Sequence, residues 1–213
     1  MMIPDLFSQF HFNDLSRHLI GADIPFSIQI ENMEAGWINI SFTAENTNAS
    51  YSASKLTNAL SDLLEAVVDI LPGIGEHDKY FGTLGIRSRC THDLEAQGSM
   101  VIDFKRDDFR RIYVLIRQSP DLDYEEDLEL NGFDENGWWI DKSIDFQEPV
   151  LMAIILDEAV LVYHLYKACH ALLEKFNKEE YRNRFGHDFP EELLQKIRSW
   201  LKDGQSFHGY SIK

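Results

Sequence analysis

The sequence predicts an α+β fold, with an antiparallel sheet of about five strands and helices packed mainly on one face. Several short segments alternate apolar and polar residues, as strands with one buried face do. One segment after residue 55 spaces its apolar residues as a helix does, and the chain after residue 149 changes to a helical period. Because strands, a helix, strands and helices follow in that order, with hairpin-like spacing of the strands, an antiparallel sheet with helices packed on one face is favoured.

The first two strands are predicted from alternation. Residues 26–30 and 38–42 each alternate apolar with polar side chains. The residues between them, 32–36, contain a glycine and are typical of a turn, so the two strands are expected to form a hairpin. Residues 46–54 are small and polar and are expected to be a loop.

The clearest predicted element is a helix that ends before Pro72-Gly73. Ser52 or Ser54 is a candidate N-cap, because a serine hydroxyl can accept from the first free N–H groups. Proline cannot continue a helix and glycine tolerates the turn that follows one. The apolar stripe of this helix consists of Leu56, Leu60, Leu63, Leu64, Val67 and Leu71.

Three further strands are predicted beyond the helix. The stretch from Gly73 to Gly85 is expected to be a loop. Residues 100–104 and 112–116 alternate apolar and polar side chains. Residues 138–147 place mainly apolar side chains at even positions and polar ones at odd positions, which predicts a strand with a polar face.

The period becomes helical from Pro149. Two interpretations are possible for where this helix begins. Either the helix begins near Pro149, or residues 150–156 form a buried sixth strand and the helix starts at Asp157, since periodicity cannot separate the two. A short helix and a last helix follow, and residues 205–213 are expected to be a loose tail.

Length and composition predict one domain over residues 1–213, with a C-terminal helical part at about 149–204. The hydrophobic content of 44% is too high for a disordered acidic chain. Cys90 and Cys169 are too few for a disulfide framework, and no basic region followed by an apolar run opens the chain, so a cytoplasmic protein is expected. Charged residues interrupt the apolar stretch Val150–Leu173, so no membrane span is expected.

The chain carries 36 acidic against 20 basic residues, a net charge of −16. That sign repels phosphate backbones, so no nucleic acid is expected as a partner. Residues 120–148, called the acidic segment below, hold a net −10. So many like charges cannot be buried together without counter-ions. The segment is therefore either a solubilising loop or a docking surface for a basic partner.

A tryptophan pair follows the densest acidic residues. On a strand Trp138 and Trp139 point to opposite faces, and Trp139 shares the polar face of Asp141. Aromatic residues on such faces are enriched in binding hot spots, although cover by a helix, a loop or a cross-strand aromatic would also explain Trp139. The expected partner-binding residues are Trp139, Asp121, Asp123, Glu125, Glu126 and Asp141.

No recognised spacing of catalytic, cofactor or metal-binding residues occurs. The eight histidines form no H-E-x-x-H motif, and no C-x-x-C is present. Asp121, Asp123 and Glu125 alternate as calcium ligands do, but Glu126 stands where the loop needs glycine and Gly132 where it needs glutamate. Catalytic residues, cofactors and metals are therefore not predicted.

A group of basic residues lies just before the acidic segment and is expected to pair with neighbouring acidic loops on the same surface. Its members are Lys105, Arg106, Arg110, Arg111 and Arg117.

The function expected from the acidic segment and Trp139 is that of a non-catalytic interaction protein that binds a basic protein. Immunity proteins, antitoxin-like inhibitors and adaptors have this physical profile. The alternative is a small-ligand-binding protein or enzyme with a cleft near the Gly73–Gly85 loop. The oligomeric state stays open.

Overall fold

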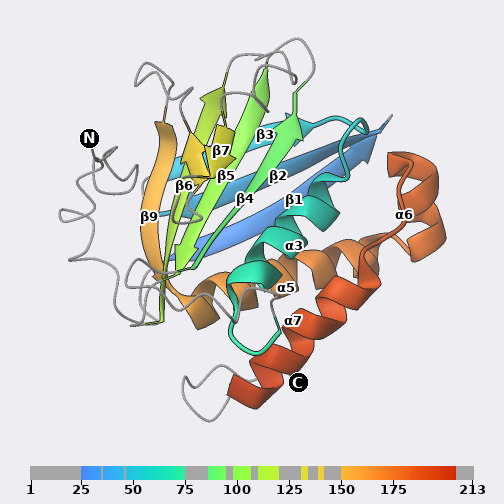
Figure 1. Cartoon of the computed structure of the whole chain (residues 1–213). Coiled ribbons are helices and arrows are strands. Elements are labelled where there is room, and N and C mark those ends of the chain that lie inside the picture. The colour runs from blue at the N-terminus through green and yellow to red at the C-terminus, as the bar shows by residue number, and fades with distance from the viewer. Residues whose placement is uncertain are drawn as a thin grey trace.

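The computed structural model describes residues 25–34, 36–45, 47–74, 86–94, 98–106, 110–119, 131–133, 139–141 and 150–204. It confirms the α+β class (Figure 1). The prediction of about five strands in one sheet is wrong in detail, because the strands divide into antiparallel sheets of three and four strands and a separate pair. The predicted tail 205–213 lies outside the described residues.

The three-stranded sheet has the order β1-β2-β3. Its strands are β1 (Phe26–Glu34), β2 (Trp37–Ala44) and β3 (Thr47–Ala53). The predicted hairpin is present, with Gly36 at φ +90° in its turn, a conformation that glycine adopts without a Cβ clash. The third strand was expected to be a loop. It turns Ala49, Tyr51 and Ala53 inward, and its small polar residues face outward.

The four-stranded sheet has the order β4-β5-β6-β9. Its strands are β4 (Ile86–Asp93), β5 (Ser99–Arg106), β6 (Arg111–Ser119) and β9 (Val150–Asp157). All three pairings are antiparallel. The open question about residues 150–156 is therefore settled in favour of a strand, and its β-branched and apolar residues suit a strand that is buried on both faces.

The predicted helix is α3 (Ala59–Ile70), which packs against β4 and β5. Leu60, Leu63 and Leu64 are fully buried, as the stripe predicts. The N-terminal boundary was placed too early, since Leu56 precedes the helix and is 70% exposed. Asn58 occupies the N-cap position without a side-chain cap bond, so the expected serine cap is also wrong.

Three helices follow β9 and lie along one side of the strands, as Figure 1 shows. They are α5 (Glu158–Lys175), α6 (Lys178–Phe185) and α7 (Glu191–Gly204). Asp157 caps α5, because its carboxylate accepts from the Ala159 backbone N–H at 2.8 Å. Helix α5 packs on β1, and α7 packs on α3 and α5, so one core joins both sheets with the helices.

Candidate functional site

The acidic segment is the connection between β6 and β9, two strands that pair directly with each other. It includes a two-stranded unit of β7 (Asn131–Phe133) and β8 (Trp139–Asp141). Two neighbouring antiparallel strands can be joined by a turn of a few residues. Residues 120–149 are therefore an insertion, because a much shorter turn would be enough to connect β6 with β9.

Two of the expected partner-binding residues lie on β8. Trp139 is opposite Phe133, and Asp141 is opposite Asn131. Because alternate residues of a strand share a face, the backbone places Trp139 and Asp141 on the same side of β8. The described part of this strand is Trp139–Asp141, and the other residues of the predicted strand 138–147 lie outside the described ranges. The remaining expected residues, Asp121, Asp123, Glu125 and Glu126, also lie outside them.

Two of the predicted basic residues pair with a buried carboxylate from α5. Glu158 is fully buried, and its Oε2 accepts from Arg106 Nε at 2.7 Å. Its Oε1 forms an ion pair with Arg110. Glu158 is the first residue of α5, so this cluster fixes the start of the helix to the β5–β6 turn. The sequence predicted pairing with acidic loops on the same surface, whereas the carboxylate that Arg106 and Arg110 contact is a buried residue of α5.

A buried polar pair joins the two sheets. The Tyr51 hydroxyl lies 2.7 Å from His92 Nδ1, with Tyr51 on β3 and His92 on β4. His92 has no exposed surface, and its Nε2 has no hydrogen-bond partner among the described residues. Burial lowers the pKa of His92 to about 3, against a smaller raising effect of the Ala59 backbone. His92 is therefore neutral at physiological pH, and its role is to link the two sheets within the buried core. Sequence spacing gave no sign of this pair, because its members are 41 residues apart.

Asp62 on α3 is a second group with a shifted pKa. Burial, and next the neighbouring Glu65 carboxylate, raise the pKa of Asp62 to about 6, while His187 opposes the shift. A carboxyl group with such a pKa can exchange a proton near neutrality. Within the described ranges, however, no three His, Cys, Asp or Glu side chains converge as metal ligands.

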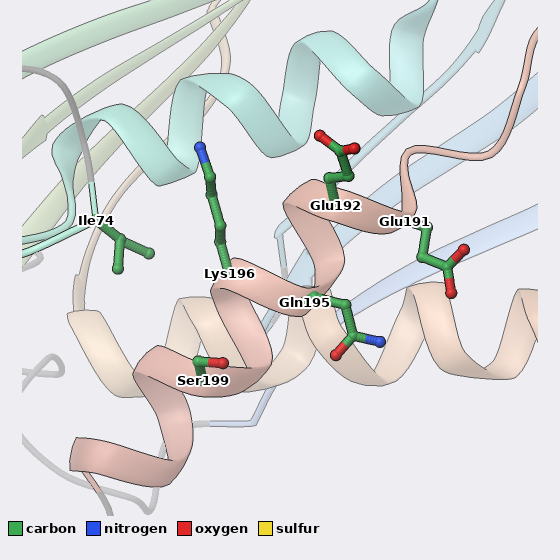
Figure 2. Close-up of a pocket in the computed structure, with 6 residues that line it drawn as sticks. All are labelled: Ile74, Glu191, Glu192, Gln195, Lys196 and Ser199. Carbon is green, nitrogen blue, oxygen red and sulfur yellow. The ribbon is translucent and has the colours of Figure 1, made fainter.

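A shallow groove of about 580 Å³ lies where α7 meets the start of the Gly73–Gly85 stretch. Figure 2 shows Glu192 and Lys196 reaching toward α3, while Glu191 and Gln195 point away. These four side chains are exposed, and Ile74 supplies the apolar contact on the opposite side. The lining that the structure describes comes from α7 and from Ile74, and its polar groups remain in contact with water.

The two cysteines, Cys90 and Cys169, are free and buried. Burial raises the pKa of the Cys169 thiol to about 12, so it is not a reactive thiolate. Among the described helices, none has the length and apolar character needed to cross a bilayer. Comparison of the chain with protein-family models, with curated proteins and with solved structures finds no match.

Proposed function

We propose that this chain is a non-catalytic interaction protein that binds a basic protein through the acidic segment. The observation that carries the proposal is the insertion of a net −10 between two directly paired strands. Because these acidic residues belong to an insertion, a partner can bind them without any change in the structure of the sheet. A concentrated field of one sign steers an oppositely charged partner and raises its association rate.

The β7–β8 unit supports the proposal because it offers a place for an anchor. Trp139 lies opposite Phe133 in the register of this pair, which is also the cross-strand aromatic arrangement that would explain Trp139 without a partner. Tryptophan is enriched at the centres of interfaces, where it supplies a large contact area for few frozen torsions. In this proposal the acidic residues govern the association rate and Trp139 governs the dissociation rate.

Affinity capture tests the proposal. The full-length protein is immobilised, and bound proteins from native lysate are identified by mass spectrometry for three forms in parallel. The first form is wild type, and the second is Asp121→Asn, Asp123→Asn, Glu125→Gln and Glu126→Gln together. The third removes four exposed carboxylates from the helical part: Glu174→Gln, Glu179→Gln, Asp188→Asn and Glu192→Gln.

The expected result is a basic protein captured by wild type and by the helical control, and lost from the form with the neutralised acidic segment. Equal loss from both variants would indicate a general effect of net charge and would contradict the proposal. Capture of a small ligand, with binding lost on Lys196→Ala, would instead support the alternative function at the α7 groove.

A further inference from the structure

The three-stranded sheet presents one face to solvent. Its inward residues belong to the core, and Ile38, Ile40 and Phe42 of the central strand are 0% exposed. The alternate residues point outward and are exposed or partly exposed. We call this outward surface the hydroxyl-amide face. The strand register arranges it in three rows: Ser27, Thr43 and Asn48; Gln29, Ser41 and Ser50; Glu31, Asn39 and Ser52.

The hydroxyl-amide face carries little charge for a chain of this composition. Its nine residues comprise five hydroxyls, three amides and one carboxylate, that of Glu31. Five of the eight residues of α6 are charged, although that helix is exposed to the same solvent. Contact with water alone therefore does not account for the composition of this face. A surface rich in uncharged donors and acceptors is suited to a ligand of the same kind.

Trp37 extends the hydroxyl-amide face beyond the third row. It lies two residues before Asn39 on β2, so the two side chains share one side of the sheet, and Trp37 is partly exposed. Glu31 is opposite Asn39 in the register, and Glu34 is opposite Trp37. Neighbours across strands are about 5 Å apart, and alternate residues of one strand are about 7 Å apart. An aromatic ring, an amide and a carboxylate are thus within reach of one hexose-sized molecule.

Hydrogen bonds between strands hold two of the amides in place. The Ser52 hydroxyl donates to Asn39 Oδ1, and the Thr43 hydroxyl donates to Asn48 Oδ1 at 3.4 Å. Each amide oxygen therefore already has a donor, and the amide N–H groups can donate to a ligand. Because these side chains are held before binding, less conformational entropy is lost when a ligand binds.

We propose that the hydroxyl-amide face binds an uncharged glycan, with Trp37, Asn39 and Glu31 as its principal contacts. Sugar hydroxyls both donate and accept hydrogen bonds, so they match a surface that combines amide N–H donors, hydroxyls and a carboxylate acceptor. The C–H groups on one side of a pyranose ring can pack on the face of an indole. An extended chain of sugars can span several of the rows.

The charge of the protein favours an uncharged ligand at this face over a charged one. The net charge of −16 repels sulfated glycans and phosphate backbones. A basic ligand is drawn to the acidic segment instead, where the net charge is −10. An uncharged glycan is subject to neither effect. The inference does not rest on the proposed function, since the acidic segment and the hydroxyl-amide face are different parts of the chain.

A glycan array tests the inference. The full-length protein is applied to an array that carries neutral, sulfated and sialylated glycans, and the neutral oligosaccharide that binds best is then titrated by isothermal calorimetry. We expect binding to neutral glycans that changes little with salt, because no ion pair is involved. Binding to no neutral glycan, or to sulfated or sialylated glycans alone, would overturn the inference.

Three variants of the face and one control locate the site. Ser41→Glu places a carboxylate at the centre of the rows, Asn39→Ala removes an amide without a change in charge, and Trp37→Ala removes the aromatic surface. In proteins that melt as wild type does, each should weaken binding of the same oligosaccharide about tenfold or more. Ser199→Glu makes the same charge change on an exposed residue of α7 and should leave the affinity unchanged. Equal losses for Ser41→Glu and Ser199→Glu, or wild-type affinity in the variants of the face, would contradict the inference.

Discussion

The Tyr51 hydroxyl and His92 Nδ1 lie 2.7 Å apart and join the three-stranded sheet to the four-stranded sheet inside the core. Both side chains are buried, so neither can exchange its partner for water without opening the contact between β3 and β4. A neutral imidazole that carries its proton on Nε2 accepts a hydrogen bond from the Tyr51 hydroxyl at Nδ1, while Nε2 has no hydrogen-bond partner among the described residues. The pair therefore makes the contact between the sheets dependent on the protonation state of one histidine.

Acid should destabilise the fold through His92. Its pKa is lowered to about 3 in the folded state from the ordinary 6.5. The unfolded chain consequently binds the proton first as the pH falls below 6.5, and stability is lost between about pH 6.5 and 3. Chemical denaturation at pH 7 and pH 4 should show a loss larger in wild type than in His92→Gln, by about 3 kcal/mol. An identical pH dependence in both proteins would contradict this.

Removal of the tyrosine hydroxyl should also weaken the core. Tyr51→Phe leaves His92 Nδ1 buried without its donor, and an unsatisfied buried polar group costs about 1–3 kcal/mol. Equilibrium urea unfolding at pH 7 measures the change. A value below about 0.5 kcal/mol would mean that another group or a water replaces the hydroxyl.

Asp62 should act in the opposite direction on the pH axis. Its pKa is raised to about 6 in the fold from 3.8, so its contribution to stability is present below about pH 3.8 and is lost as the pH rises through 6. Asp62→Asn should therefore melt at a higher temperature than wild type at pH 8 and at nearly the same temperature at pH 4. A destabilised Asp62→Asn protein at pH 8 would show that the ionised carboxylate is favourable.

The stripe of α3 offers a matched pair of leucines. Leu60 is 0% exposed and Leu56 is 70% exposed, although both belong to the same predicted stripe. Leu60→Ala should cost about 2–5 kcal/mol of unfolding free energy, and Leu56→Ala less than about 0.5 kcal/mol. Similar costs for both would show that α3 is not seated as described.

The elements found from the sequence are those with strong one-sided patterns, such as β1, β2 and α3. Strand β3 was missed because its inward residues include two alanines, Ala49 and Ala53, which give a weak apolar signal. Strand β4 was missed because its inward residues include Cys90 and His92, and the histidine is made compatible with burial by Tyr51 from another sheet. Such compensation depends on tertiary contacts that no local pattern contains.

The division into two sheets has the same origin, since alternation shows that a strand has a buried face and does not show which strand lies beside it. The candidate site also depends on strand neighbours that a local sequence pattern does not show. Charge counting located the acidic segment, but the direct pairing of β6 with β9, which makes that segment an insertion, became visible only in the sheet topology.

Binding kinetics with the captured basic partner show whether the acidic segment is the docking surface. Neutralising Asp121, Asp123, Glu125 and Glu126 together should lower the association rate about tenfold or more at low salt and make it less dependent on salt. Trp139→Ala should leave the association rate nearly unchanged and raise the dissociation rate. Association and dissociation rates that are indifferent to both changes, in proteins that melt as wild type does, would contradict a docking role for the acidic segment.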